Sequence, residues 1–274
     1  MILFPNAKIN IGLDILRRRP DGYHDISTVM CPVGWRDVLE IVPSASGETS
    51  LNVTGRTVDC PPEKNLVMKA YRRLSEAMPL PPVDIYLHKV IPDGAGLGGG
   101  SADAAFMLIG LNRLFCLGLS DEQLAETAAS LGADCAFFIY NRPMLCEGTG
   151  TSMTPVDLDI SHYCIAIVKP PVSVPTAQAY AGCTPAEPES PLLSRLTLPV
   201  ERWSGIVKND FEPSIARLHS EIEHIKNGLT GMGAIYTAMS GSGSAVFGLF
   251  NHDILADELR ALFADHDIFV QPAQ

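Results

Sequence analysis

A glycine-dense segment, PDGAGLGGGS at residues 92–101, is the strongest candidate for chemistry in the chain. Five of the seven residues from Gly94 to Gly100 are glycine, a costly choice in conformational entropy unless the backbone must approach another group closely. A short apolar strand is expected before the segment and a helix after it. Successive backbone N–H groups and the positive end of the helix dipole would then face a bound anion. The sequence therefore predicts a phosphate-binding loop; the alternative, a flexible surface turn, seldom needs five glycines.

Neither of two familiar phosphate motifs fits this loop. Gly94, Gly96 and Gly99 match the G-x-G-x-x-G pattern of dinucleotide sites, but that fold also needs an acidic residue about 20 positions on, after a second strand. Asp121 has nearly that spacing, yet it lies in the first turn of an expected helix. A Walker A loop needs Gly-Lys-Ser/Thr after the glycines, and none follows here.

Two charged residues stand in apolar segments of the sequence, and charged side chains are seldom buried unless they are paired. Asp134 precedes the apolar run at residues 136–139, and Lys8 begins an otherwise apolar expected strand. Asp134 could simply cap a turn or a helix, and Lys8 could be an edge-strand lysine that faces water.

Metal chemistry receives no support from the side chains. The segment HSEIEH at residues 219–224 is not the zinc pattern H-E-x-x-H, and it reads as the solvated face of an amphipathic helix. The seven cysteines contain no C-x-x-C pair, which removes most zinc and redox motifs. No metal ligand is therefore predicted.

The composition limits the partners of the chain. Its 274 residues carry 20 Lys+Arg against 31 Asp+Glu, a formal charge of −11, which argues against a nucleic-acid partner. No apolar stretch is long enough to span a membrane, and the first residues do not resemble a signal peptide. We expect a cytoplasmic protein in a reducing compartment, and the sequence does not indicate its oligomeric state.

The expected elements indicate an α+β protein with two parts. A Gly/Thr/Pro stretch at residues 148–155 is the expected boundary, which divides the chain into residues 1–152 and 153–274. The second part has the order β-α-β-β-α-β, which is the ferredoxin-like order. The expected strands are Lys8–Leu13, Asp37–Val42, Thr49–Val53, Val83–Val90, Tyr163–Val168, Ala234–Ser240, Ala245–Phe250 and Ile268–Gln271. The expected helices are Asn65–Ala77, a run from the glycine loop to near Gly118, Ser120–Leu131, Ser214–Asn227 and Ile254–Ala264.

Three segments resemble the sequence motifs of the GHMP kinases, named for galactose, homoserine, mevalonate and phosphomevalonate. They are PNAKIN at residues 5–10, the glycine loop, and MSGSGSAVF at residues 239–247. The blocks AKINIGLDILRRRPDGYHDISTVM, LGADCAFFI and NDFEP resemble the branch that acts on a cytidine-diphosphate-linked polyol. The general motif has Ser-Ser where this chain has Gly99 and Gly100, so we expect its loop to bind through backbone N–H groups.

The resemblance implies a two-lobed GHMP kinase fold, with a strand-rich N-terminal lobe that holds the phosphate loop and a ferredoxin-like C-terminal lobe. It also implies transfer of the γ-phosphoryl group of ATP, with Mg²⁺, to the 2-hydroxyl of a diphosphocytidyl-linked methylerythritol, a step in the non-mevalonate route to isoprenoid precursors. The alternatives are another GHMP kinase, of mevalonate or homoserine type, and a non-catalytic nucleotide-binding module.

The resemblance assigns roles to individual residues. Asp134 matches the catalytic aspartate, and Lys8 the lysine that pairs with it and polarises the acceptor hydroxyl; such a pair would also explain a buried lysine. The implied substrate-binding residues are Asn10, Tyr23, His24 and Tyr180, with both tyrosines on the cytosine ring. The implied ATP-binding residues are Asn65, Lys89, Pro92, Gly94, Gly96, Leu97, Gly98, Gly99, Gly100 and Ser101. Asn65 could instead be a helix N-cap, and Lys89 a solvated lysine.

Overall fold

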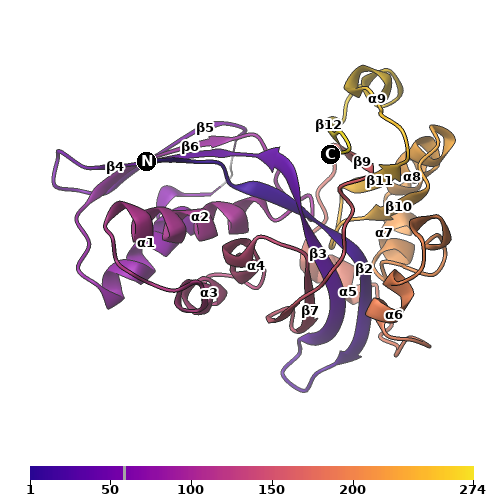
Figure 1. Cartoon of the computed structure of the whole chain (residues 1–274), viewed down its shortest axis with the longest axis horizontal. Helices are drawn as coiled ribbons and strands as arrows, with labels where there is room; N and C mark the ends of the chain where they lie inside the picture. The colour runs from indigo at the N-terminus through magenta and orange to yellow at the C-terminus, as the bar shows by residue number, and fades with distance from the viewer. Residues whose placement is uncertain (58–59) are drawn as a thin grey trace. The chain divides into compact units, whose positions relative to one another are not determined.

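The computed structural model describes residues 1–57 and 60–274 (Figure 1). It contains two compact units built from interleaved segments. Unit 1 comprises Met1–Lys8, Gly34–Asp93 and Gly98–Arg142, and unit 2 comprises Ile9–Val33, Gly94–Leu97 and Pro143–Gln274. The expected division into residues 1–152 and 153–274 stays a prediction. Within the described residues, no helix is long and apolar enough to cross a membrane.

Unit 1 contains a four-stranded sheet in the order β1-β4-β6-β5. Its β5–β6 pair is parallel and the other two pairs are antiparallel. The helices α1 and α2 cover one face of this sheet (Figure 1). The bounds are β1 Ile2–Leu3, β4 Val38–Pro43, β5 Ser50–Gly55, β6 Val83–Lys89, η1 Pro62–Lys64, α1 Leu66–Ala77, α2 Gly99–Leu114, α3 Asp121–Ala129 and α4 Cys135–Tyr140.

Two helix starts in unit 1 follow from local sequence signals. The side chain of Asn65 accepts a hydrogen bond from Val67 N at 2.9 Å and caps α1. Ser120 and Gln123 form the capping box expected from their spacing at the start of α3. The helix expected over residues 120–131 ends earlier, at Ala129.

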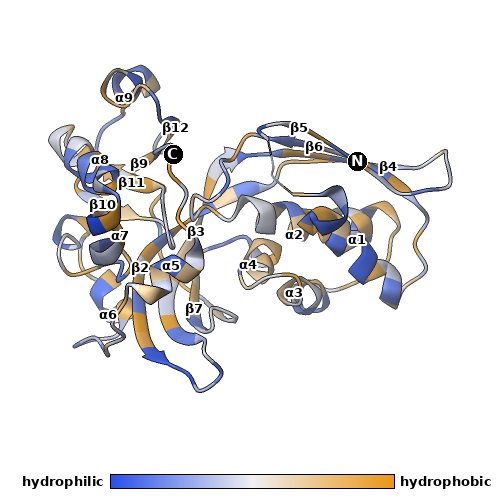
Figure 2. Ribbon diagram, turned by 180° about the vertical axis from the view of Figure 1, so that it is seen from behind, coloured by the Kyte–Doolittle hydropathy of each residue, from blue (hydrophilic) through white to orange (hydrophobic). Residues whose placement is uncertain are grey.

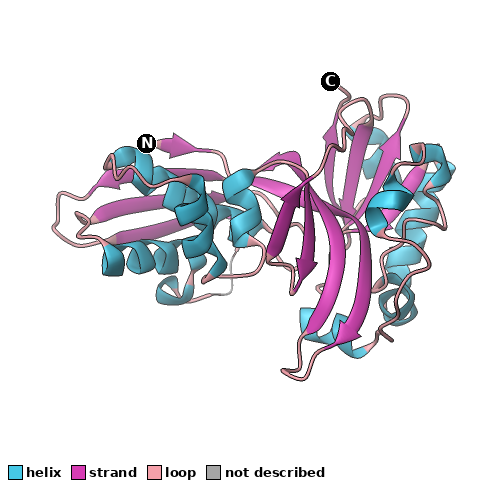
Figure 3. Ribbon diagram, turned by 60° about the horizontal axis from the view of Figure 1, so that its bottom comes forward, coloured by secondary structure: helices cyan, strands magenta, loops and turns pink. Residues whose placement is uncertain are grey.

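Unit 2 contains an antiparallel sheet in the order β10-β11-β9-β12. This is the strand order of a ferredoxin-like sheet, and it confirms the order expected from the sequence. Strands β9 and β11 are almost entirely apolar (Figure 2). The helix α8 packs on β10 and β11, and Figure 3 shows helices in cyan beside the strands in magenta. The bounds are β9 Cys164–Lys169, α5 Thr176–Ala181, α6 Leu192–Leu196, η2 Val200–Arg202, α7 Glu212–Leu218, α8 Ser220–Gly231, β10 Tyr236–Met239, β11 Val246–Phe250, α9 Ala256–Leu262 and β12 Asp267–Gln271.

The single helix expected over Ser214–Asn227 is wrong. His219 has an extended backbone, with φ −136° and ψ 90°, so α7 ends at Leu218 and α8 begins at Ser220. Neither glycine nor proline lies at this break. The helical spacing of apolar residues continues across it, so the sequence does not indicate that the helix ends.

A third sheet has the order β2-β3-β7-β8. Its first strand, β2, is far longer than the expected strand Lys8–Leu13, because apolar residues continue along it. The strand β3 lies where the sequence predicts none, although most of its residues are buried. The side chains of Lys8 and Asn10 share one face of β2, since side chains alternate along a strand. The bounds are β2 Asn6–Arg18, β3 His24–Arg36, β7 Met144–Gly148 and β8 Ser152–Pro155.

Candidate active site

Lys8 and Asp134 form an ion pair within unit 1. The Lys8 Nζ lies 3.4 Å from Asp134 Oδ2, and the lysine side chain is 3% exposed whereas the aspartate side chain is 31% exposed. Asp134 precedes α4 but its side chain makes no capping hydrogen bond. The reading of Lys8 as a lysine that faces water is therefore wrong, and so is the reading of Asp134 as a side-chain cap of a helix. The pair offers a buried cation beside a carboxylate that a ligand can reach.

Gly98 lies against this ion pair at the start of α2. It has a φ of +72°, a left-handed conformation that favours glycine. A Cβ at this position would lie 2.9 Å from Phe138 Cζ and 3.3 Å from Lys8 Cε. No side-chain hydrogen bond caps α2 among the described residues, so the first N–H groups of the helix are available to an anion.

The preceding part of the loop, Gly94–Leu97, belongs to unit 2. It is hydrogen-bonded to the last of the three GHMP segments, residues 239–247 (the third glycine motif). Ser240 Oγ donates to Gly96 O at 2.9 Å and accepts from Asn10 N at 3.2 Å. Ala245 N donates to Ala95 O at 3.1 Å. A Cβ on Gly96 would lie only 1.9 Å from the Ser240 carbonyl oxygen, so this close approach of two backbones requires glycine.

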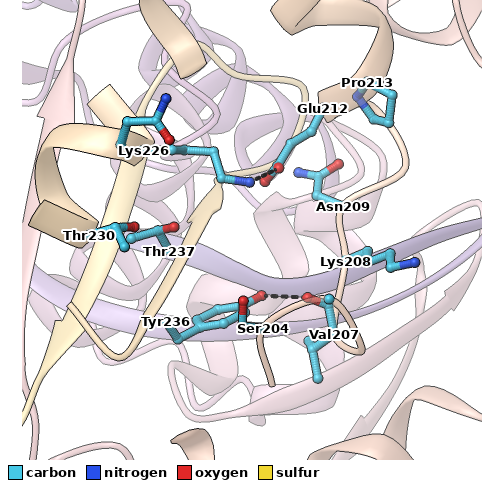
Figure 4. Close-up of a pocket in the computed structure, with 12 residues that line it drawn as sticks. Ser204, Val207, Lys208, Asn209, Glu212, Pro213, Lys226, Thr230, Tyr236 and Thr237 are labelled. Carbon is cyan, nitrogen blue, oxygen red and sulfur yellow. Dashed lines mark hydrogen bonds and ion pairs between the residues drawn. The ribbon is translucent and has the colours of Figure 1, made fainter. Parts of the chain in front are cut away.

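The NDFEP block, residues 209–213, forms hydrogen bonds with the backbone of the third glycine motif. Asn209 Nδ2 donates to Met239 O and Gly241 O, both at 2.8 Å, and Glu212 Oε1 accepts from Met239 N at 2.6 Å. Figure 4 shows both side chains in the wall of a cavity of about 330 Å³, where Lys226 pairs with Glu212. Sequence reasoning used this block only for the resemblance and gave its residues no role.

The four residues expected to bind the polyol substrate all lie in unit 2. Tyr23 is 68% exposed, in a turn where Asp21 Oδ1 accepts from Tyr23 N. Asn10 is buried and its amide donates to Thr28 Oγ1 at 3.0 Å. The ring of His24 stacks on that of Tyr180, with centroids 4.7 Å apart and an interplanar angle of 16°. The structure therefore brings His24 and Tyr180 together; the contact of both tyrosines with cytosine stays a prediction.

Lys89 is buried, so the reading as a solvated lysine is wrong. Its Nζ lies 2.5 Å from Asp37 Oδ2 and 2.6 Å from Asp103 Oδ2. Sequence reasoning missed both carboxylates, although each stands in an apolar segment, which is the signal that singled out Asp134. Asn65 caps α1, as its alternative reading expected, and the contacts of Asn65 and Lys89 with ATP stay predictions.

Comparisons with known proteins match the chain to one kinase family. The model for the GHMP kinases N terminal domain matches residues 65–142, and that for GHMP kinases C terminal matches residues 200–265. The chain is 50% identical to 4-diphosphocytidyl-2-C-methyl-D-erythritol kinase from Parabacteroides distasonis over 97% of both chains. It is 52% identical to the Bacteroides fragilis protein of that name over 92% of both.

Solved structures extend the comparison to the fold. A crystal structure of 4-(cytidine 5'-diphospho)-2C-methyl-D-erythritol kinase has a TM-score of 0.80, with 32% identity over 98% of both chains. Homoserine kinase from Cytophaga hutchinsonii has a TM-score of 0.69 at 19% identity, covering 98% of this chain and 94% of that one. This second likeness extends to the fold alone.

Proposed function

The chain belongs to the 4-diphosphocytidyl-2-C-methyl-D-erythritol kinases of the GHMP kinase family, and we propose that it transfers the γ-phosphoryl group of ATP to the 2-hydroxyl of that substrate. The observation that carries the mechanism is the ion pair of Lys8 with the accessible carboxylate of Asp134. A carboxylate beside a cation can take a proton from an alcohol while the cation stabilises the oxygen that loses it.

In this mechanism, Asp134 accepts the proton of the acceptor hydroxyl as that oxygen attacks the γ-phosphorus. The bond from the γ-phosphorus to the bridging oxygen breaks, and ADP leaves. Lys8 lowers the energy of the developing negative charge on the attacking oxygen, because its ammonium group lies beside Asp134. The close packing of Gly98 on Lys8 and Phe138 fixes the lysine in place. Because little covalent chemistry is required of the protein, such positioning accounts for much of the catalysis in phosphoryl transfer.

ATP would bind through the backbone N–H groups of the glycine loop and the uncapped start of α2. No group of three His, Cys, Asp or Glu side chains among the described residues could hold a metal ion. We propose that Mg²⁺ enters with ATP, bound to its phosphates, as part of the substrate, because Mg²⁺ sites in proteins use substrate phosphates together with at most one or two carboxylates. Mg²⁺ bound in this way neutralises charge on the transferred phosphoryl group.

The substrate-binding role rests on the aromatic groups of unit 2. Tyr23 exposes its ring to solvent, and a base stacked on such a ring gains about 1–3 kcal/mol. We propose that Tyr23 and Tyr180 contact the cytosine and that Asn10 and His24 bind the polyol by hydrogen bonds. We also propose a cytoplasmic location, which the seven free cysteines support, four of them buried.

The test is ADP release by the purified chain with three alcohols: 4-diphosphocytidyl-2-C-methyl-D-erythritol, mevalonate and homoserine. Turnover with the first alone is expected. Comparable turnover with mevalonate or homoserine would favour the other GHMP kinases, and ATP binding without turnover on any alcohol would favour a non-catalytic module. The Lys8–Asp134 pair argues against the module, because a pure binder has no use for a base.

A further inference from the structure

Three buried charged side chains form a network next to the glycine loop in unit 1. The ammonium group of Lys89, at the end of β6, contacts carboxylate oxygens of Asp37 and Asp103 at 2.5 and 2.6 Å. Exposure of the three side chains is 4% or less. They come from three separate segments: the end of β6, the turn between β3 and β4, and the second turn of α2. None of the GHMP motifs discussed above gives Asp37 or Asp103 a role.

The network fixes the backbone from which the loop begins. Asp37 Oδ1 accepts hydrogen bonds from Val90 N at 2.5 Å and Ile91 N at 2.8 Å, the two residues directly before the loop. Asp37 N also donates to Pro5 O at 2.8 Å, in the segment that leads to Lys8. A Cβ on Gly99 would lie 3.4 Å from Lys89 Nζ. The network therefore connects three parts of the backbone: the segment before Lys8, the residues Val90 and Ile91 directly before the loop, and the first turn of α2.

The charges in this network do not balance. One ammonium group faces two carboxylates, which gives a net charge of −1 when all three groups are ionised. Asp103 Oδ1 is buried and has no hydrogen-bond partner among the described residues. Burial raises the pKa of Asp103 to about 7, against the opposing charge of Lys89, and the negative charge of Asp37 adds to the increase. A proton on Asp103 makes the network neutral.

Other charged groups on the elements around α2 do not enter the network. Strand β4 packs on α2, but its Glu40 alternates with the buried residues Leu39 and Ile41 and so lies on the other face of the strand. The helices α1, α3 and α4 also pack on α2, and α4 carries no charged residue. The charged residues of α1 and α3 are exposed: Lys69, Arg72, Arg73, Glu76, Asp121, Glu122 and Glu126. Arg36, next to Asp37, and Arg113 on α2 are exposed as well. The Lys8–Asp134 pair lies against Gly98, and its cation already has its own carboxylate.

We propose that Lys89, Asp37 and Asp103 are positioning residues for the phosphate loop, and that loss of the proton from Asp103 weakens the binding of the ATP phosphates. The proposal rests on the proposed function, because it assumes that the loop binds ATP. As the pH rises through neutrality, the network gains a negative charge behind an anion site. The affinity for the nucleotide then falls roughly 3- to 30-fold, the effect of one unit charge over several ångströms at an effective dielectric constant of about 20 to 40.

The experiment measures the dissociation constant of a magnesium complex of adenylyl imidodiphosphate by calorimetry, near pH 6 and near pH 8.5. Asp103→Asn mimics the protonated acid, because its amide has the same shape without the charge. Asp93→Asn is the matched control, since Asp93 is an exposed carboxylate in the same loop. Ionisation of the nucleotide itself is common to all the proteins and cancels in their ratios.

We expect the dissociation constant of the parent to rise 3- to 30-fold more than that of Asp103→Asn between the two pH values, and Asp93→Asn to respond as the parent does. An equal pH response in the parent and Asp103→Asn overturns the proposal. Loss of the response in Asp93→Asn as well also overturns it, because the effect then belongs to surface charge. If Asp103→Asn does not fold, Asp103→Ala leaves Lys89 and Asp37 as a neutral pair and serves the same purpose.

An infrared measurement on the ligand-free protein separates this proposal from the proposed function. The carbonyl band of a protonated, buried carboxylic acid should be present near pH 6, disappear near pH 8.5, and be missing from Asp103→Asn at both. Absence of that band from the parent near pH 6 overturns the proposal whether or not the nucleotide binds. If the band titrates but the parent binds no nucleotide at either pH, the proposed function fails and the claim of weakened binding fails with it.

Discussion

Substitution of Gly98 by alanine tests whether the phosphate loop requires glycine at this position, both for its backbone conformation and for ATP binding. A residue with a side chain at a left-handed φ of +72° costs about 1–2 kcal/mol. The new Cβ would also lie 2.9 Å from a buried ring carbon of Phe138 and 3.3 Å from Lys8 Cε, and such overpacking costs about 1–3 kcal/mol. We expect Gly98→Ala to lower the free energy of unfolding by about 2–5 kcal/mol, which corresponds to a decrease in Tm of roughly 4–20 °C.

Gly100→Ala is the matched control for this substitution. Its Cβ would meet only Leu66 Cδ1, at an ordinary distance of 3.7 Å, and Gly100 lies in the first turn of α2. Because alanine restricts the unfolded chain, Gly100→Ala should leave the free energy of unfolding unchanged or raise it by about 0.4–1 kcal/mol. Its Tm should therefore be equal to that of the parent or slightly higher.

The assay is thermal unfolding of the parent and both variants, with and without ATP and Mg²⁺. ATP at 100 times its dissociation constant stabilises a protein by about 2.7 kcal/mol, so the parent should show an increase in Tm that Gly98→Ala lacks. The reasoning is refuted if Gly98→Ala and Gly100→Ala have equal Tm values without ligand. It is also refuted if ATP stabilises Gly98→Ala as much as the parent.

Three further substitutions test the site. Asp134→Asn removes the proton acceptor beside Lys8 and should lower turnover by roughly 10²–10⁴ with little effect on substrate binding; near-normal turnover would exclude Asp134 from catalysis. Tyr23→Ala should raise KM for the cytidine substrate by roughly 5- to 150-fold, and an equal loss of ATP affinity would point to misfolding. Asn209→Ala leaves the buried carbonyls of the third glycine motif without a donor and should cost about 2–4 kcal/mol of stability in thermal unfolding. The control Asn227→Ala, at an exposed position beside the same cavity, should cost little, and equal losses would contradict the role of Asn209.

Features set by neighbouring residues could be predicted from the sequence. The glycine loop before α2, the Ser120 capping box and the order of strands and helices along the C-terminal part of the chain all depend on local patterns of glycine, cap residues and apolar spacing. The ion pair of Lys8 with Asp134 joins residues 126 positions apart. Its prediction needed the family resemblance, because nothing local links the two segments.

Features that depend on distant contacts could not be predicted. Lys89 meets carboxylates 52 and 14 residues away, and a lone lysine at the end of a strand gives no sign of such partners. The break at His219 has no local signal either. The support of the third glycine motif by Asn209 depends on hydrogen bonds that span about 30 residues. In each case the packing of the folded chain decides the role of the side chain.

The most direct test of the central claim is the identity of the product. The purified chain would be incubated with ATP, Mg²⁺ and 4-diphosphocytidyl-2-C-methyl-D-erythritol, and the product examined by phosphorus and carbon NMR. We predict one new phosphomonoester, coupled to the methyl-bearing carbon C2, formed in equal amount to ADP. A phosphate on another hydroxyl, or release of inorganic phosphate with the polyol unchanged, would contradict the account.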